Sequence, residues 1–267
     1  MSMNGVSLGP TRSDSLDALY HEAESAAGSV ALALGLVGGL ETSPLPGQGS
    51  TLRLWETLAT IAAADLTVAR TAEPHLDALA ILAQAGIPAP KGTWGVFAAE
   101  GPGARLTATN DDVAWRLDGR KPWCSLASRL DHAVVTAHVG DNERRAFTVD
   151  LRQDGVDAVP GTWASRGLSA VDSGAVDFEK AAAQPVGDNN WYLSRDGFAW
   201  GGIGVAACWY GGTVGVARRL FFAAAARKPD QIALMHLGHV DAWLFQARTA
   251  LVEAAALVDS GDAAARR

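Results

Sequence analysis

Three consecutive residues, Trp123, Cys124 and Ser125, could contribute directly to binding or chemistry. They lie in the segment KPWCSLAS, residues 121–128. A tryptophan beside a small hydroxyl residue could shield one face of a planar cofactor and offer it a hydrogen bond. The alternative is a tryptophan that simply fills the core of a β domain. Aromatic side chains serve that structural purpose so often that chemistry alone favours the second interpretation.

A glycine pattern further along resembles a dinucleotide-binding loop but lacks its context. Gly202, Gly204 and Ala207 match G-x-G-x-x-A. That loop follows a buried strand, and an acidic residue about 20 positions later binds a ribose. The preceding residues SRDGFAW do not read as a buried strand, and no acid follows near residues 222–226. The pattern therefore does not predict a nucleotide site.

Histidine and serine motifs are equally weak. His236 and His239 are three positions apart and could share one face of a helix, as metal ligands do. No second carboxylate–histidine pair accompanies them, so no metal site is predicted. Ser169 and Ser173 lack the G-x-S-x-G turn that exposes a nucleophile, which argues against a serine hydrolase.

The stretch FAWGGIGVAACWYGGTVGVA, residues 198–217, contains no acidic or basic side chain. Its length equals the roughly 20 residues that a membrane-spanning helix needs. A single span within a β-containing chain would be unusual, however, and small residues recur at helical spacing at positions 201, 204, 208, 211 and 215. Glycine costs a helix interior about 1 kcal/mol relative to alanine, so packing must stabilise this helix. The pattern favours a buried bundle helix.

Three blocks of sequence surround these motifs. Up to about residue 86, alanine and leucine recur at helical spacing, and helices return over residues 197–227 and 231–258. Between them, short runs rich in valine and threonine alternate with turn residues, and Asp118-Gly119 is a strong hairpin signal. Because no long helix separates the strands, the pattern predicts an antiparallel barrel or sandwich.

The predicted fold class is therefore α+β with several domains. We expect a helical domain over residues 1–91, a β domain over residues 92–187 and a second helical region over residues 188–267. The 267-residue chain is long enough for this arrangement.

Composition restricts the choice of partners. The formal net charge is −7 and no basic cluster exceeds a pair, so a nucleic-acid partner is not expected. Two cysteines give no disulfide framework, and the N-terminus does not read as a secretory signal. We therefore expect a cytoplasmic protein without a membrane span.

Over residues 40–258 the sequence resembles the acyl-CoA dehydrogenase family. WGVFAAEGPGA, residues 94–104, is similar to the first flavin-contacting segment of that family, and WRLDGRKPWCSLAS to its G-x-K-x-W-I-[TS]-N segment. RGLSAVDSGAVDFEKAAAQPVG resembles the strand and connection that lead into the family's helical bundle. The family's order of helical domain, β-barrel and helical bundle matches the order of the three blocks.

The resemblance implies an FAD-dependent oxidoreductase acting on CH–CH groups in fatty acid metabolism. Its reaction would be α,β-dehydrogenation of an acyl-CoA thioester, with hydride transfer to FAD and then transfer to an electron acceptor. Trp123 would lie against the isoalloxazine and the Ser125 hydroxyl, beyond Cys124, would reach its N5 region. Main-chain groups of Phe97, Ala98 and Ala99 would bind the pyrimidine edge.

This sequence also departs from the family pattern. Ala99 replaces a threonine, residues 104–106 replace a G-S-D run, and Gly201-Gly202 replace an acid–arginine pair. The two helices that usually follow, with the catalytic glutamate, have no counterpart. We therefore expect an incomplete C-terminal bundle, no identifiable catalytic residue, and an apolar face that requires a homo- or hetero-oligomeric partner, formed by Leu234, Leu237, Leu244, Leu251 and Leu257.

Three alternatives remain open from the sequence. The chain could be a non-catalytic partner subunit that binds flavin or a CoA thioester, or a truncated fragment. It could also be a flavin-dependent monooxygenase on the same fold.

Overall fold

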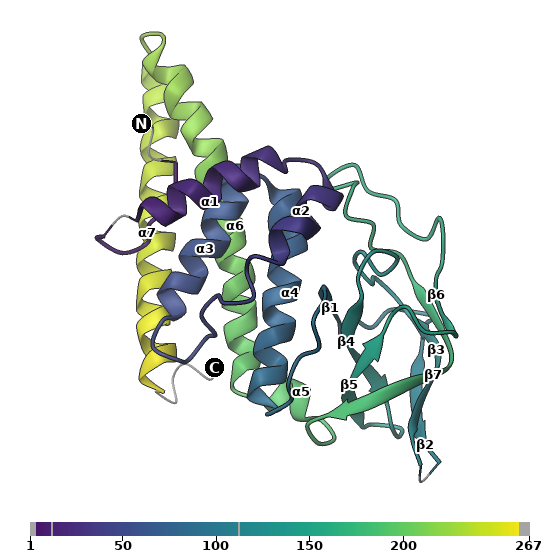
Figure 1. Cartoon of the computed structure of the whole chain (residues 1–267). Coiled ribbons are helices and arrows are strands. Elements are labelled where there is room, and N and C mark those ends of the chain that lie inside the picture. The colour runs from purple at the N-terminus through teal and green to yellow at the C-terminus, as the bar shows by residue number, and fades with distance from the viewer. Residues whose placement is uncertain (1–3, 12, 112, 262–267) are drawn as a thin grey trace. The chain divides into compact units, whose positions relative to one another are not determined.

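The computed structural model describes residues 4–11, 13–111 and 113–261, which form α-helices and one β-sheet (Figure 1). The chain divides into two compact units. One contains the described residues of Met1–Leu36, Thr42–Glu73 and Ala199–Arg267, and the other contains Val37–Glu41 and Pro74–Phe198. Helices from both ends of the sequence thus share one unit, while the sheet belongs to the other.

The first unit is helical. It contains α1 (Asp14–Ser25), α3 (Thr51–Ala64) and α7 (Gln231–Ser260), and most of α2 (Val30–Val37) and α6 (Gly197–Ala225). It also contains the start of α4 (Leu66–Gln84), which continues into the second unit at Pro74. The Asp230 carboxylate accepts a hydrogen bond from the N–H of Ala233 at 2.8 Å and so caps α7. The predicted start of this helix is confirmed.

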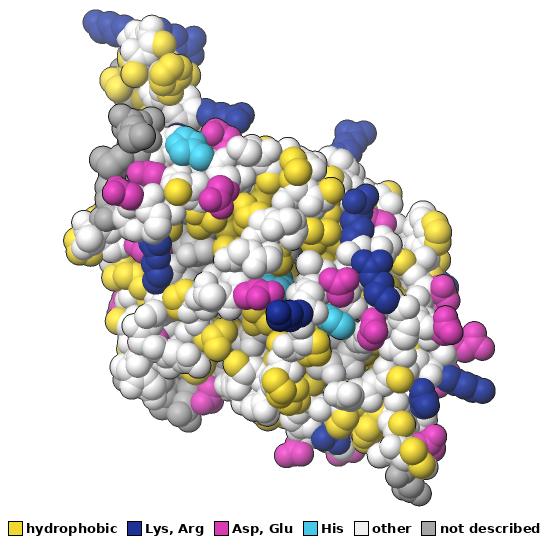
Figure 2. Space-filling view, viewed as in Figure 1, with side chains coloured by type: hydrophobic (Ala, Val, Ile, Leu, Met, Phe, Trp, Pro, Cys, Tyr) yellow, Lys and Arg dark blue, Asp and Glu magenta, His cyan; other side chains and the backbone are white. Residues whose placement is uncertain are grey.

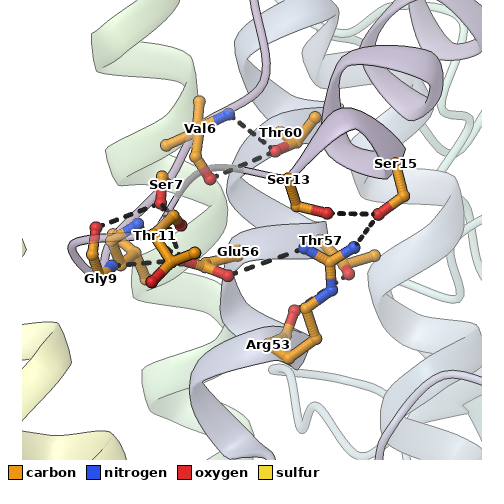
Figure 3. Close-up of polar contacts among 11 residues, drawn as sticks. Val6, Ser7, Gly9, Thr11, Ser13, Ser15, Arg53, Glu56, Thr57 and Thr60 are labelled. Atoms are coloured by element: carbon orange, nitrogen blue, oxygen red, sulfur yellow. Dashed lines mark hydrogen bonds and ion pairs between the residues drawn. The ribbon is translucent and has the colours of Figure 1, made fainter.

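The N-terminal segment, residues 4–11, is fastened to α3 by buried polar groups (Figure 3). The carboxylate of Glu56, only 7% exposed, accepts hydrogen bonds from the N–H of Leu8 at 2.9 Å and of Gly9 at 3.1 Å. The N–H of Val6 donates to the Thr60 hydroxyl at 2.9 Å. The side chains of Val6 and Leu8 are buried. This segment is therefore part of the core of the helical unit.

The glycine-rich helix α6 packs against the backbone of α3. A Cβ placed on Gly211 would overlap the carbonyl oxygen of Ala59, and one placed on Gly215 would lie 2.5 Å from the carbonyl oxygen of Ala63. Only glycine permits two backbones to approach this closely. The predicted helix is confirmed, but it is buried on its glycine-rich face only, since Trp209 is 49% exposed and Val216 is 70% exposed. None of the helices within the described residues is long and apolar enough to span a membrane.

The apolar face predicted on α7 is partly covered. Leu251 is 6% exposed, whereas Leu234 is 56% exposed. A groove of about 520 Å³ separates α6 from α7 and is lined by residues such as Trp209 and Trp243. Near the α6–α7 connection, exposed hydrophobic side chains gather beside basic ones (Figure 2). These hydrophobic side chains include Leu220, Phe222, Ile232, Leu234 and Met235.

The second unit is built on a barrel-like sheet of seven strands. They are β1 (Trp94–Phe97), β2 (Leu106–Asn110), β3 (Trp115–Lys121), β4 (His132–His138), β5 (Arg144–Asp150), β6 (Val156–Ala158) and β7 (Val176–Val186). The strand order is β1-β4-β2-β3-β7-β5, with an additional β4–β5 pairing that closes a ring and β6 paired to β7. Helix α5 (Trp191–Ser194) follows the last strand.

The sheet is mixed, so the prediction of a purely antiparallel sheet is wrong for two pairs. β1 and β4 are parallel, as are β2 and β4. Parallel neighbours need a crossover connection, for which a helix is the usual choice. Here the strands themselves provide it, because β3 returns the chain between β2 and β4.

The hairpin predicted at Asp118-Gly119 is also wrong, because both residues lie inside β3. Gly119 has a φ of 116° at a bulge between Leu117 and Gly119, and a Cβ there would overlap the carbonyl oxygen of Arg105. Positive φ suits bulges as well as turns, so Asp-Gly does not distinguish them. The turn between β2 and β3 instead uses Asp111, whose carboxylate accepts the N–H of Ala114 at 2.9 Å.

The second half of α4 supplies a hydrophobic cover for this sheet. Ala78, Ile81 and Leu82 pack in one buried cluster with Trp94 of β1. The cluster also contains Val134, Ala146, Val186 and Tyr192. Val96 and Ala98 also pack against this cluster, which therefore holds the end of β1 and the first residues after it. Three of the predicted cofactor residues, 97–99, lie there.

Candidate functional site

A tight loop over residues 122–126 follows β3 and carries Trp123, Cys124 and Ser125. Trp123 and Leu126 have φ values of 55° and 59°. This left-handed conformation is uncommon for bulky residues and stores about 1–3 kcal/mol. The N–H of Cys124 donates to the carbonyl of Gly174 at 2.8 Å, and that of Leu126 donates to the carbonyl of Asp172 at 2.6 Å. These bonds hold the loop in its strained form.

The indole of Trp123 is 50% exposed although it is a large aromatic side chain. Its six-membered ring rests against Gly101, where a Cβ would approach Cη2 of Trp123 and Cγ of Pro122 to 3.2 Å. A larger residue at position 101 would displace the ring. The structure thus supports the indole on Gly101 and leaves part of it open for a planar molecule.

Ser125 is linked to a second serine. Its Oγ lies 2.8 Å from the Oγ of Ser173, which itself donates to the carbonyl of Val171 at 3.1 Å. With the Ser173 proton directed to Val171, Ser125 donates to Ser173 and its own lone pairs can accept a hydrogen bond from a ligand. Ser173 therefore sets the orientation of the Ser125 hydroxyl.

Cys124 points inward. Its side chain is 1% exposed and Sγ donates to the carbonyl of Lys121 at 3.4 Å. Burial raises the pKa of this thiol to about 12, despite the nearby Lys121 charge. A thiol of this kind is not a nucleophile at neutral pH, and the main-chain N–H of Cys124 already donates to Gly174, so Cys124 holds the loop together.

The other predicted cofactor residues continue from β1. Phe97 is 2% exposed and ends the strand, paired in register with Val135 of β4. The main chain then continues through Ala98 and Ala99. The Thr136 hydroxyl donates to the carbonyl of Ala98 at 3.4 Å, which holds this segment beside β4.

A charged cluster links the segment of residues 97–99 to the loop of residues 123–125. Lys121, 1% exposed, donates through Nζ to the Glu100 carboxylate at 2.7 Å and to the Thr136 hydroxyl at 2.9 Å. Nε2 of His138 lies 3.3 Å from the same carboxylate, and an Arg144 nitrogen lies 3.6 Å from it. The cluster therefore connects the segment after β1 with β3, β4 and β5.

Burial and charge act against each other in this cluster. Burial lowers the pKa of the Lys121 ammonium, although the Glu100 carboxylate raises it. Partial burial raises the pKa of Glu100, but the hydrogen bonds and charges of Lys121 and His138 outweigh it, so the net pKa is lowered. Glu100 is thus a carboxylate at neutral pH.

The structure places the two predicted sets in one unit and connects them through residues that the sequence argument did not single out. Lys121 bonds to Glu100 and Trp123 packs on Gly101, which makes this connection, while Ser173 orients Ser125. Glu100, Gly101 and Lys121 lie within the two segments that resemble the flavin-contacting motifs, which was the available signal. A separate cavity of about 600 Å³ in this unit is lined by residues such as Trp94, Trp115 and His132, and by none of the predicted cofactor residues.

No protein-family model and no curated protein match this sequence. Solved structures do match its fold. A complex of PigA with FAD has a TM-score of 0.78 at 15% identity, covering 96% of this chain and 82% of PigA. KijD3 in complex with FMN and a dTDP-linked aminodeoxy keto sugar has a TM-score of 0.68 at 18% identity, covering 97% and 76%.

The methanesulfinate monooxygenase MsuC from Pseudomonas fluorescens is also similar. Its TM-score is 0.65 at 18% identity, covering 94% of this chain and 71% of MsuC. Two of these neighbours, PigA and KijD3, are thus flavin complexes, and the third is a monooxygenase. At such identities the likeness concerns the fold, and it agrees with the helical and β-barrel elements that the sequence predicted.

Proposed function

We propose that this chain is a flavin-dependent oxidoreductase that holds FAD beside Trp123. The observation that carries the proposal is the half-exposed indole, supported by Gly101 in a loop that maintains a left-handed tryptophan. Strained backbone persists where the surrounding structure enforces it, and such positions cluster at ligand sites. The FAD and FMN complexes of PigA and KijD3 support a flavin as the planar ligand.

The residues present fit such a cofactor. Trp123 would stack on the ring system, while main-chain groups of residues 97–99 would bind its polar edge. Ser125, oriented by Ser173, offers acceptor lone pairs that suit an N–H group of the cofactor. When bound, a flavin supplies hydride acceptance or oxygen activation, which the side chains cannot perform. Cys124 contributes by anchoring the loop rather than by thiol chemistry.

For the reaction itself, two candidates have specific support. The similarity of residues 94–104 and 115–128 to flavin-contacting motifs favours α,β-dehydrogenation of an acyl-CoA thioester with an external electron acceptor. Monooxygenation is favoured by MsuC, and the sugar nucleotide bound to KijD3 is a substrate class unrelated to CoA. We consider monooxygenation the better supported of the two, because MsuC, a monooxygenase, has a similar fold over 94% of this chain.

A visible absorption spectrum of the purified protein tests the shared proposal. We expect bound flavin, or stoichiometric uptake after incubation with FAD or FMN. A chain that takes up neither flavin would refute the proposal. The two reactions then separate under different conditions. Anaerobic bleaching of the flavin by acyl-CoA thioesters indicates dehydrogenation. Oxygen consumption by the reduced, flavin-loaded protein indicates oxygen chemistry, and hydroxylated or oxidised product identifies monooxygenation.

A further inference from the structure

Lys121 is the most deeply buried charged side chain near the proposed flavin site. It is 1% exposed, whereas its partner Glu100 keeps 32% of its side chain exposed. Taking an ammonium out of water costs several kcal/mol unless it is paired and hydrogen-bonded. Both requirements are met, because Nζ donates to Glu100 at 2.7 Å and to Thr136 at 2.9 Å.

These two hydrogen bonds join the segments that carry the predicted flavin contacts. Glu100 follows Ala99 directly, and Thr136 also donates to the carbonyl of Ala98 at 3.4 Å. On the other side, the main-chain carbonyl of Lys121, two residues before Trp123, accepts a hydrogen bond from the thiol of Cys124, the residue after it, at 3.4 Å. One residue therefore connects the end of β1 with the tryptophan loop.

We propose that Lys121 is a positioning residue of the flavin site, which fixes residues 98–101 against the loop of Trp123 through its bonds to Glu100 and Thr136. This inference rests on the proposed flavin function. Its consequence is that Gly101 stays under the indole and the main chain of residues 98–99 keeps its direction toward the cofactor edge. Loss of the ammonium leaves both segments folded but allows them to move relative to each other.

Substitutions at Lys121 and Glu100 can distinguish an effect on the flavin site from an effect on the stability of the fold. Glu100 retains His138 at 3.3 Å and Arg144 at 3.6 Å, as well as contact with water, if Lys121 is replaced by methionine. Replacing Glu100 by glutamine instead leaves a buried ammonium without its carboxylate, which is strongly destabilising. The double variant removes both charges and should regain stability without regaining the link.

Arg120 provides a matched control on the same strand. It is ion-paired with Asp177 at 2.6 Å, and both side chains are nearly half exposed. It precedes Lys121 by one residue, so its side chain points to the opposite face of β3. Arg120→Met therefore removes a neighbouring basic side chain without touching the buried cluster.

The test compares wild type, Lys121→Met, Glu100→Gln, the double variant and Arg120→Met. For each, FAD dissociation constants come from fluorescence titration, unfolding midpoints from urea denaturation, and the environment of the bound ring from visible circular dichroism at saturating FAD. We expect Lys121→Met and the double variant to bind FAD at least tenfold more weakly and to show a reduced flavin dichroism. Their unfolding midpoints should stay near that of wild type, and Arg120→Met should bind within twofold of wild type.

Two outcomes would overturn the inference while the flavin function stands. One is binding within twofold of wild type for Lys121→Met. The other is a loss of affinity that follows the unfolding midpoints across all variants, with Glu100→Gln the weakest binder, because Lys121 would then be only structural. If Lys121→Met does not fold, the double variant alone makes the same comparison. A wild-type chain that binds neither FAD nor FMN would overturn the function and this inference together.

Discussion

Trp123 combines two costs that an ordinary core tryptophan would avoid. Its backbone is left-handed, with a φ of 55°, and half of its indole remains in contact with solvent. Either feature reduces the stability of the free chain. A ligand stacked on the indole would bury its exposed part and so offset the cost of this conformation in the complex. Residue type alone favours a structural role for Trp123, whereas its conformation and exposure make it the strongest functional candidate.

We expect Trp123→Ala to weaken FAD binding by about tenfold, since an aromatic pair contributes about 0.5–1.5 kcal/mol beyond its buried area. Fluorescence titration of the purified variant measures this. Trp243, which is 64% exposed on α7, offers a matched control, and Trp243→Ala should bind FAD as wild type does. Equal affinity for wild type and Trp123→Ala would remove the indole from the proposed site.

Glu56 is a second residue whose role depends on its surroundings. Its buried carboxylate accepts two main-chain N–H groups of the N-terminal segment. A buried hydrogen bond to a charged group contributes about 1.5–3 kcal/mol, and of these two bonds the one from Leu8 is buried while the one from Gly9 is only partly buried. We expect Glu56→Ala to lower the free energy of unfolding by about 2–3 kcal/mol in urea denaturation. The exposed Glu22→Ala should change it by less than about 0.5 kcal/mol, and a similar small change for Glu56→Ala would contradict this account.

At the scale of elements, the sequence predicted the positions of those helices whose pattern depends only on neighbouring residues. The helices α6 and α7 and the break at residues 228–230 all lie within a few residues of their expected positions. Patterns that depend on distant partners were less informative. The bulge at Gly119 arises because Arg105 lies opposite it, and the parallel pairing of β1 with β4 depends on the path of two intervening strands. Neither partner is visible from the Asp-Gly pair or from a valine run.

The glycines of α6 permit a direct test of helix packing. Gly211 faces the carbonyl of Ala59, whereas nothing lies within 4 Å of a Cβ built on Gly202. We expect Gly211→Ala to destabilise the protein by about 1–3 kcal/mol through overpacking. Gly202→Ala should stabilise it by up to about 1 kcal/mol through helix propensity. Urea denaturation of the pair checks both signs, and equal effects would mean that α6 does not contact α3 through this face.

At the scale of the whole molecule, the candidate site was only half predictable. The segments holding Phe97, Trp123 and Ser125 could be found because each resembles a short motif. Lys121 and Glu100 are 21 positions apart, and Ser125 and Ser173 are 48 apart, so their pairing depends on the closure of the barrel. Long-range hydrogen bonds of this kind orient the functional groups, yet they leave no periodic pattern in a single sequence.

The folded molecule should also respond to acid through a group outside the site. His75 on α4 is 2% exposed, and neither ring nitrogen has a hydrogen-bond partner in the described part of the chain. Burial lowers its pKa below the ordinary value of 6.5, although the carboxylate of Glu41 opposes this shift. In the unfolded chain the ring takes up a proton near pH 6.5, whereas in the folded chain it stays neutral to lower pH. Its contribution to stability is therefore complete above pH 6.5 and declines as the pH falls toward the folded pKa.

Replacing His75 by leucine should remove this dependence. An apolar side chain of similar size leaves no buried nitrogen unpaired, so the free energy of unfolding of His75→Leu should be equal to or above that of wild type at pH 7.5. Between pH 7 and about 5 the variant should lose less stability than wild type, because its unfolded chain lacks the His75 ring that would take up a proton. His236 is exposed on α7, and His236→Gln should keep the wild-type slope. Urea denaturation at several pH values gives the three slopes, and a wild-type slope in His75→Leu would show that acid sensitivity in this range originates elsewhere.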